Sequence, residues 1–211
     1  MKSYGKLTAG IIAVWFLFAL SASALRLFTN NANRIGVSVA LAAGIPILLF
    51  FLWSAASSGF RQFALSLNPG TLTLVHSMRI VGIVFVVLEA RGALPAVFAW
   101  PAGYGDIFMG LTATFAAWKL AHPGRRGSFI LWQFLGIADL VTAVALGTTA
   151  GLLSPDGPSM LPMTVLPLSL IPTFFVPLLL ILHIIAIAQA SAWKRAPLAS
   201  SHTNPSPALV L

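Results

Sequence analysis

Six long apolar runs, each followed by a short polar segment, limit what this chain can fold into. A helix needs about 20 apolar residues to cross the roughly 30 Å hydrocarbon core of a bilayer, and each run is close to that length. None alternates apolar and polar residues as the strands of an outer-membrane barrel do. The sequence therefore predicts an all-α integral membrane protein, a bundle of about six transmembrane helices. The predicted spans are about 7–25, 35–54, 72–90, 97–120, 128–151 and 166–190.

The composition agrees with this class. Of the 211 residues, 58% are hydrophobic and only 8% are charged, whereas about 25% are charged in soluble domains. The net charge is +8, but the basic residues are scattered between the apolar runs. We therefore expect them to set the orientation in a lipid bilayer, with no role in nucleic-acid binding. The absence of cysteine excludes disulfides and thiolate metal sites.

The distribution of Lys and Arg predicts that both termini lie in the cytoplasm, because cytoplasmic loops carry the excess of basic residues. We expect the plasma (inner) membrane of a bacterium. Residues 1–193 would form a single polytopic transmembrane domain, and the Pro- and Ser-rich segment 194–211 a disordered cytoplasmic tail. The inner segments would hold Lys2, Lys6, Arg61, Lys119, Arg125, Arg126, Lys194 and Arg195, and the outer ones Arg26, Arg34 and Arg91.

The first span also has the features of a cleavable signal peptide. Lys2 and Lys6 precede an apolar run, and the small residues Ala22-Ser23-Ala24 follow it. Cleavage would leave five spans with an outer N-terminus. We expect the span to be retained.

Small residues recur at every fourth position in two of the spans. Gly36, Ala40 and Gly44 do so in the second span, and Gly147 and Gly151 in the fifth. Such stripes let helix backbones approach closely in lipid. They predict helix contacts, either within the chain or between copies in a homo-oligomer.

Six ionisable residues lie inside the predicted spans, where a charge costs about 2.5–3.5 kcal/mol on insertion scales. We expect them to face the bundle interior and to form a substrate or proton pathway. No catalytic residue is assigned. The candidates are His76, Arg79, Glu89, Asp106, Asp139 and His183.

Their expected depths divide these residues into two groups. His76 and Arg79, one turn apart in the inner third of their span, would meet Asp139 and His183 in an inner cluster. Arg79 and Asp139 would either fix helix register as an ion pair or line a solvated cavity. The outer group would contain Glu89, Arg91 and Asp106.

Proline predicts that the fourth and sixth helices are broken. Pro101, with Gly103 and Gly105, suggests that the fourth helix restarts at Pro101 and carries Asp106 near its positive end. In the sixth span, proline recurs every five residues, which is not a helical period. The first two of these prolines, Pro162 and Pro167, would belong to an extended segment that leads into the helix. The last, Pro177, would kink the helix and free a carbonyl for a ligand, for Thr173 or for a neighbouring helix. The four are Pro162, Pro167, Pro172 and Pro177.

A short pattern occurs twice. Gly103-Tyr104-Gly105-Asp106 and Gly136-Ile137-Ala138-Asp139 share a Gly, a small residue and an Asp, on consecutive spans of opposite direction. Inverted repeats of transporters have this relation.

Three functions fit these features. The first is a small permease or carrier with a polar cavity, in which Arg79 binds an anionic group or holds Asp139 and the histidines exchange protons. The second is a membrane-embedded redox protein or enzyme, with His76 and His183 as haem or metal ligands. The third is a structural subunit of a membrane complex. Walker A, Rossmann and serine-hydrolase motifs are absent from the sequence, and apart from that haem alternative we predict no cofactor.

Overall fold

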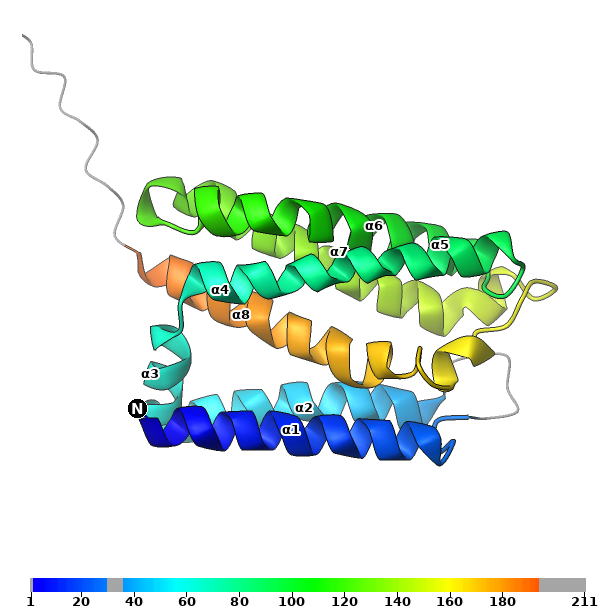
Figure 1. Cartoon of the computed structure of the whole chain (residues 1–211), viewed down its shortest axis with the longest axis horizontal. Coiled ribbons are helices and arrows are strands. Elements are labelled where there is room, and N and C mark those ends of the chain that lie inside the picture. The colour runs from blue at the N-terminus through cyan, green and yellow to red at the C-terminus, as the bar shows by residue number, and fades with distance from the viewer. Residues whose placement is uncertain (1, 30–35, 194–211) are drawn as a thin grey trace, which may run out of the picture.

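A computed structural model describes residues 2–29 and 36–193, and every regular element in these ranges is a helix. The tail predicted at 194–211 lies outside the described residues. The long helices run side by side in alternating directions (Figure 1). The elements are α1 (Lys2–Ala24), α2 (Val37–Ala56), α3 (Ser58–Ser66), α4 (Pro69–Val75), η1 (His76–Gly82), α5 (Ile83–Ala90), α6 (Ala96–Phe115), η2 (Ala116–Leu120), η3 (Pro123–Arg125), α7 (Arg126–Leu153), η4 (Leu161–Thr164), η5 (Ile171–Phe175) and α8 (Val176–Ala192).

Five of the described helical stretches are long and apolar enough to cross a membrane. They confirm the predicted all-helical class and support a membrane-embedded protein. One more long helix, α6, has 20 residues. It is less apolar than the other five, because it contains Asp106 and several Pro and Gly residues. The five stretches are Tyr4–Ala24, Val37–Ala56, Pro69–Ala90, Pro123–Leu153 and Ile171–Ala192.

Apolar side chains cover the outside of the bundle, whereas several polar ones are inside it. Val14, Val37 and Trp118 are 68%, 75% and 76% exposed. Arg79 and Gln133, in contrast, are buried. This distribution suits a lipid solvent, in which large apolar side chains need no cover.

The fourth helix is not broken as predicted. Pro95 takes the N-cap position, and α6 then runs from Ala96 through Pro101 without interruption. Pro101 lacks an N–H, but only the single backbone bond to Val97 is lost, close to the helix start. Asp106 therefore lies ten residues into α6, about 15 Å from its beginning, and not near the positive end of a restarted helix.

The sixth span begins later than predicted, and its entry is not extended as expected, because Pro162 lies in the 3₁₀ helix η4 and Pro167 in a turn. Pro162 and Pro167 precede the helix, which opens with the π-helix η5 and continues as α8. Pro177 has no N–H for the carbonyl of Thr173. The indole Nε1 of Trp15 in α1 donates to that carbonyl at 3.2 Å. A neighbouring helix thus satisfies the carbonyl that the proline frees.

A short helix, α3, occupies a segment that the sequence analysis treated as a connecting loop. Its Phe60 and Ala64 are buried while Arg61 is exposed. Phe60 stacks on Trp53 of α2, with ring centroids 3.8 Å apart. Figure 1 shows α3 at the end of the bundle where α1 begins, lying across the direction of the long helices.

The two small-residue stripes differ in their surroundings. Gly44 and Ala40 of α2 are exposed, and a Cβ built on Gly44 would meet nothing within 4 Å. The α2 stripe therefore makes no contact at Gly44 within the described part of the chain, and a homo-oligomer formed through it stays a prediction. Gly147 of α7 is buried.

The bond between Trp15 and Thr173 can be tested by Trp15→Phe, which keeps a ring against Phe174 and removes the N–H. We expect the free energy of unfolding to fall by about 1–3 kcal/mol, because a buried carbonyl loses its partner. Thermal denaturation in detergent measures this. Trp118→Phe is the matched control, since Trp118 is 76% exposed. Equal melting temperatures for the two variants would contradict the assignment.

Candidate functional site

The 3₁₀ helix η1 interrupts the middle of the third span and aligns three positions. At three residues per turn, His76, Arg79 and Gly82 fall on one side of the segment. All three are buried. The seven residues of η1 exceed the usual 3₁₀ length of about three or four. The sequence analysis placed His76 and Arg79 on one face but did not predict this change of helix type.

Arg79 makes an ion pair with each of two aspartates. Its Nε donates to Asp106 Oδ1 at 2.6 Å, and its Nη2 donates to Asp139 Oδ2. Its Nη1 lies 3.5 Å from the carbonyl oxygen of Gly136. The Arg79 side chain is 1% exposed and the two aspartates are each 16% exposed. We call Arg79, Asp106 and Asp139 the charge triad; with both carboxylates ionised, its net charge is −1.

Each member of the charge triad lies near the midpoint of its helix. Arg79 is central in Pro69–Ala90, Asp106 in α6 and Asp139 in α7. The predicted division into an inner and an outer group is therefore wrong for Asp106. It fails because the third span begins at Pro69 and α6 at Ala96, which brings Arg79 and Asp106 to one depth.

Glu89 lies apart from the charge triad. It is the penultimate residue of α5, half-buried, and about 16 Å along the helix from Arg79. Both ion pairs found in the described residues use Arg79, so the predicted outer group of Glu89, Arg91 and Asp106 does not form.

Glycines make room for the charged groups. A Cβ on Gly105 would collide with the Asp139 carboxylate, and one on Gly82 would collide with Asp106. Any larger residue at either position would separate the helices that carry the charge triad. Both aspartates of the repeated Gly and Asp pattern thus meet the same arginine, Arg79.

A directed chain of hydrogen bonds lies nearly two helical turns from the charge triad, since Thr73 and Gln133 are each six residues from a member of the triad. Thr73 Oγ1 donates to the carbonyl of Pro69 at 2.8 Å, so it accepts from Gln133 Nε2 at 3.1 Å. This fixes the amide orientation, and Gln133 Oε1 then accepts from His183 Nδ1 at 2.5 Å. His183 therefore carries its proton on Nδ1. Its Nε2, aimed at Gly136, has no hydrogen-bond partner in the described part of the chain.

The two histidines stack on each other. The ring centroids of His76 and His183 are 3.8 Å apart at an interplanar angle of 23°, and Trp132 packs against both rings at 5.8 Å. A metal held by both imidazoles must lie in the planes of both rings, and planes this nearly parallel do not meet close to the nitrogens. The pair therefore does not fit a haem iron or a metal held between the two rings. Nor do the described residues contain a group of three or more His, Cys, Asp or Glu placed to hold a metal ion.

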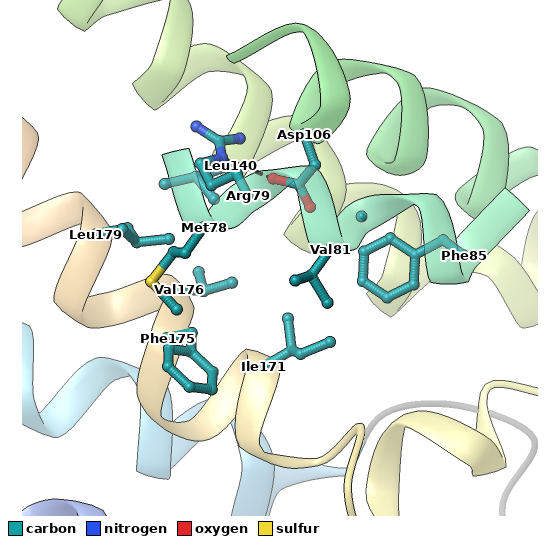
Figure 2. A pocket seen from close by; sticks show the side chains of 11 residues that line it. Met78, Arg79, Val81, Phe85, Asp106, Leu140, Ile171, Phe175, Val176 and Leu179 are labelled. Atoms are coloured by element: carbon teal, nitrogen blue, oxygen red, sulfur yellow. Dashed lines mark hydrogen bonds and ion pairs between the residues drawn. The ribbon is translucent and has the colours of Figure 1, made fainter. Parts of the chain in front are cut away.

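A cavity of about 160 Å³ borders the charge triad. Figure 2 shows the Asp106 carboxylate at the edge of a ring of apolar side chains, with the Arg79 guanidinium turned away from them. The cavity separates the third span and α6 from the end of η5 and the start of α8. Its lining residues are Met78, Arg79, Val81, Gly82, Phe85, Asp106, Leu140, Ile171, Phe175, Val176 and Leu179.

Thr73, Trp132 and Gln133 belong to this region but were missed from the sequence. The insertion cost that identifies candidate residues is large for ionisable groups, and Gln133 is an uncharged amide. The sequence does contain a signal for Gln133, because it is a polar amide inside a predicted span. It lies three residues before Gly136 and six before Asp139.

Residues 34–190 match a family described as a domain of unknown function (DUF8737), and the chain belongs to this family. The match begins just before α2 and contains the charge triad, both stacked histidines and Gln133; α1 precedes it. Comparisons with curated proteins and with solved structures gave no match.

Removal of the arginine should be the most damaging change to the charge triad. We expect Arg79→Met to lower the free energy of unfolding by about 3–5 kcal/mol, because it leaves buried carboxylates without a partner. The triple variant Arg79→Met, Asp106→Asn, Asp139→Asn should recover much of this loss. Thermal denaturation in detergent compares the two. Arg91→Met, at an exposed position, should change stability by less than about 0.5 kcal/mol. A triple variant no more stable than Arg79→Met would show that charge balance is not what holds the site.

Proposed function

We propose that this chain is a small proton-coupled carrier. The observation that supports this is the pairing of one arginine with two aspartates at the middle of the helices and beside a cavity, an arrangement with a net charge of −1 when both carboxylates are ionised. An unbalanced charge at this depth is unfavourable. Addition of one proton or one monovalent cation to a carboxylate brings the net charge of the charge triad to zero. The site can therefore be occupied in turn by a proton and by a cation.

Arg79 acts in this proposal as the fixed positive charge that holds both aspartates. Its three guanidinium nitrogens already have partners in Asp106, Asp139 and the carbonyl of Gly136. The role of Arg79 in holding Asp139 is therefore better supported than direct binding of an anionic solute by Arg79. The carboxylate of Asp106 is then the group that exchanges a proton.

The proposed topology has both termini in the cytoplasm of a bacterial inner membrane and six spans, which are the five apolar stretches and α6, the fourth along the chain. The basic residues support this orientation. Among the residues that the structure describes, the end of the bundle where α1 begins has more of them than the opposite end, which has Arg26 and Arg91 (Figure 1). The richer end has Lys6, Arg61, Lys119, Arg125 and Arg126.

A structural subunit is the second candidate. The observation that favours it is the complete burial and pairing of Arg79, which would fix the register of three helices without any transport. The redox alternative has no such support, because the stacked rings of His76 and His183 do not suit an iron between them.

Single cysteines can test whether α6 crosses the membrane, since the chain has none of its own. Arg91 and Arg125 are both exposed and flank α6. A membrane-impermeant maleimide should label Arg91→Cys in intact cells, and Arg125→Cys only after the membrane is opened. Labelling of both from the same side would rule out α6 as a span.

Transport can be tested in proteoliposomes that contain a pH-sensitive dye and carry an imposed pH gradient. A panel of small amines, acids, sugars and neutral compounds is added outside. We expect one class to change the internal pH, and Asp106→Asn and Asp139→Asn each to abolish this response, because either variant leaves Arg79 balanced by a single carboxylate and no net charge for a proton to neutralise.

Glu89→Gln is the matched control, since it changes a carboxylate of the same bundle that lies apart from the charge triad, and it should keep the response. If no solute moves protons faster than in empty liposomes, or if both aspartate variants behave as the wild type, the carrier proposal fails and the structural role stands.

A further inference from the structure

The cavity beside the charge triad offers a ligand a carboxylate and little else that is polar. Of its two charged lining residues, Arg79 is 1% exposed and Asp106 is 16% exposed. Figure 2 shows the guanidinium turned away from the apolar side chains while the carboxylate faces them. A ligand in the cavity therefore meets an acceptor of hydrogen bonds with negative charge.

The charge balance defines the charge of the ligand. One arginine and two ionised aspartates sum to −1, so in this state the site lacks one positive charge. A monocation restores neutrality. An anion would add a second uncompensated charge, and a dication would leave a positive one, in a region where charges are poorly solvated.

The rest of the lining defines the body of the ligand. Side chains such as Met78, Leu140 and Leu179 provide no partner for hydroxyl or amide groups, which argues against sugars and peptides. Phe85 and Phe175 lie on opposite sides of the cavity (Figure 2), and aromatic rings attract cations. A cavity of about 150 Å³ lined by apolar side chains binds benzene. The cavity here, about 160 Å³, suits an apolar body of similar size.

We infer that the site binds a small amphipathic monocation, an amine with an apolar body about the size of benzene, whose ammonium group pairs with Asp106. The transport of this ligand rests on the proposed carrier function, whereas its binding does not. The ammonium and a proton neutralise the same carboxylate, so each weakens the binding of the other by the same factor. In a carrier, this competition exchanges the amine for a proton across the membrane.

Binding can be measured by calorimetry on the full chain in detergent, with three probes of nearly the same shape. These are benzylammonium, neutral benzyl alcohol and anionic benzoate. We expect benzylammonium alone to bind, and more weakly as the pH falls. Asp106→Asn should weaken it at least about tenfold through the loss of one charged hydrogen bond, and Glu89→Gln should leave it unchanged.

A second variant tests the cavity with the charge triad intact, in case Asp106→Asn fails to fold. Val81 lines the cavity and is 60% exposed, so Val81→Phe adds bulk at its edge without crowding the core. It should also weaken binding at least about tenfold, because the aromatic ring takes the space of the ligand body. Ile83→Phe, at a residue 57% exposed that does not line the cavity, is its control. Equal binding of the alcohol and the ammonium, or full binding by Val81→Phe, would overturn the inference.

The two proposals fail separately. Binding of benzylammonium that depends on Asp106, without any proton movement in proteoliposomes, would refute the carrier and keep the binding site. Proton movement that depends on Asp106 and is driven by another class of solute, with no binding of benzylammonium, would keep the carrier and refute the amine.

Discussion

The pairing of one buried arginine with two partly buried aspartates determines how the third span, α6 and α7 can pack. Arg79 meets Asp106 and Asp139 at the middle of the helices, where none of the three charges is well solvated alone. Gly82 and Gly105 allow the backbones to come close enough for these pairs. The arrangement stabilises the bundle as a unit, since loss of the arginine leaves two carboxylates in a region of low polarity.

Several polar side chains around the charge triad form hydrogen bonds to another helix, whereas His76 Nδ1 and His183 Nε2 have no partner in the described residues. Gln133 of α7 bridges Thr73 of α4 and His183 of α8, and Trp15 of α1 donates to the carbonyl that Pro177 frees. In lipid, such bonds and close packing replace the hydrophobic drive between helices. The cavity at Asp106 is the place where a charged group still faces open space, which is why the proposed chemistry is located there.

Much of this architecture was predictable, because the rules that govern it are local. Helix length and apolar composition predicted the long helices, and the unfavourable burial of charge predicted the pairing of Arg79 with Asp139. His76 and His183, which were predicted to join the same cluster, stack on each other. The meeting of Asp106 with Arg79 was not predicted, since it depends on helix boundaries that differ by only a few residues from the expected ones. The break predicted at Pro101 does not occur. One proline near the start of a helix removes a single backbone hydrogen bond, and the hydrogen bonds and packing of the rest of the helix outweigh this loss. The 3₁₀ geometry of η1 had no local signal in the sequence.

That 3₁₀ segment changes the length of the third span. Seven residues that rise about 2.0 Å each cover about 14 Å, whereas an α-helix would cover about 10.5 Å. Conversion of η1 to an α-helix would draw α5 about 3.5 Å closer to α4 and turn Arg79 by about 60° relative to His76. Any movement of the arginine along the helix axis is therefore coupled to a rotation about that axis. A change of helix type over η1 would therefore shift Arg79 by about 1.5 Å relative to His76 as well as turn it, and so would change how the guanidinium is aligned with both aspartates.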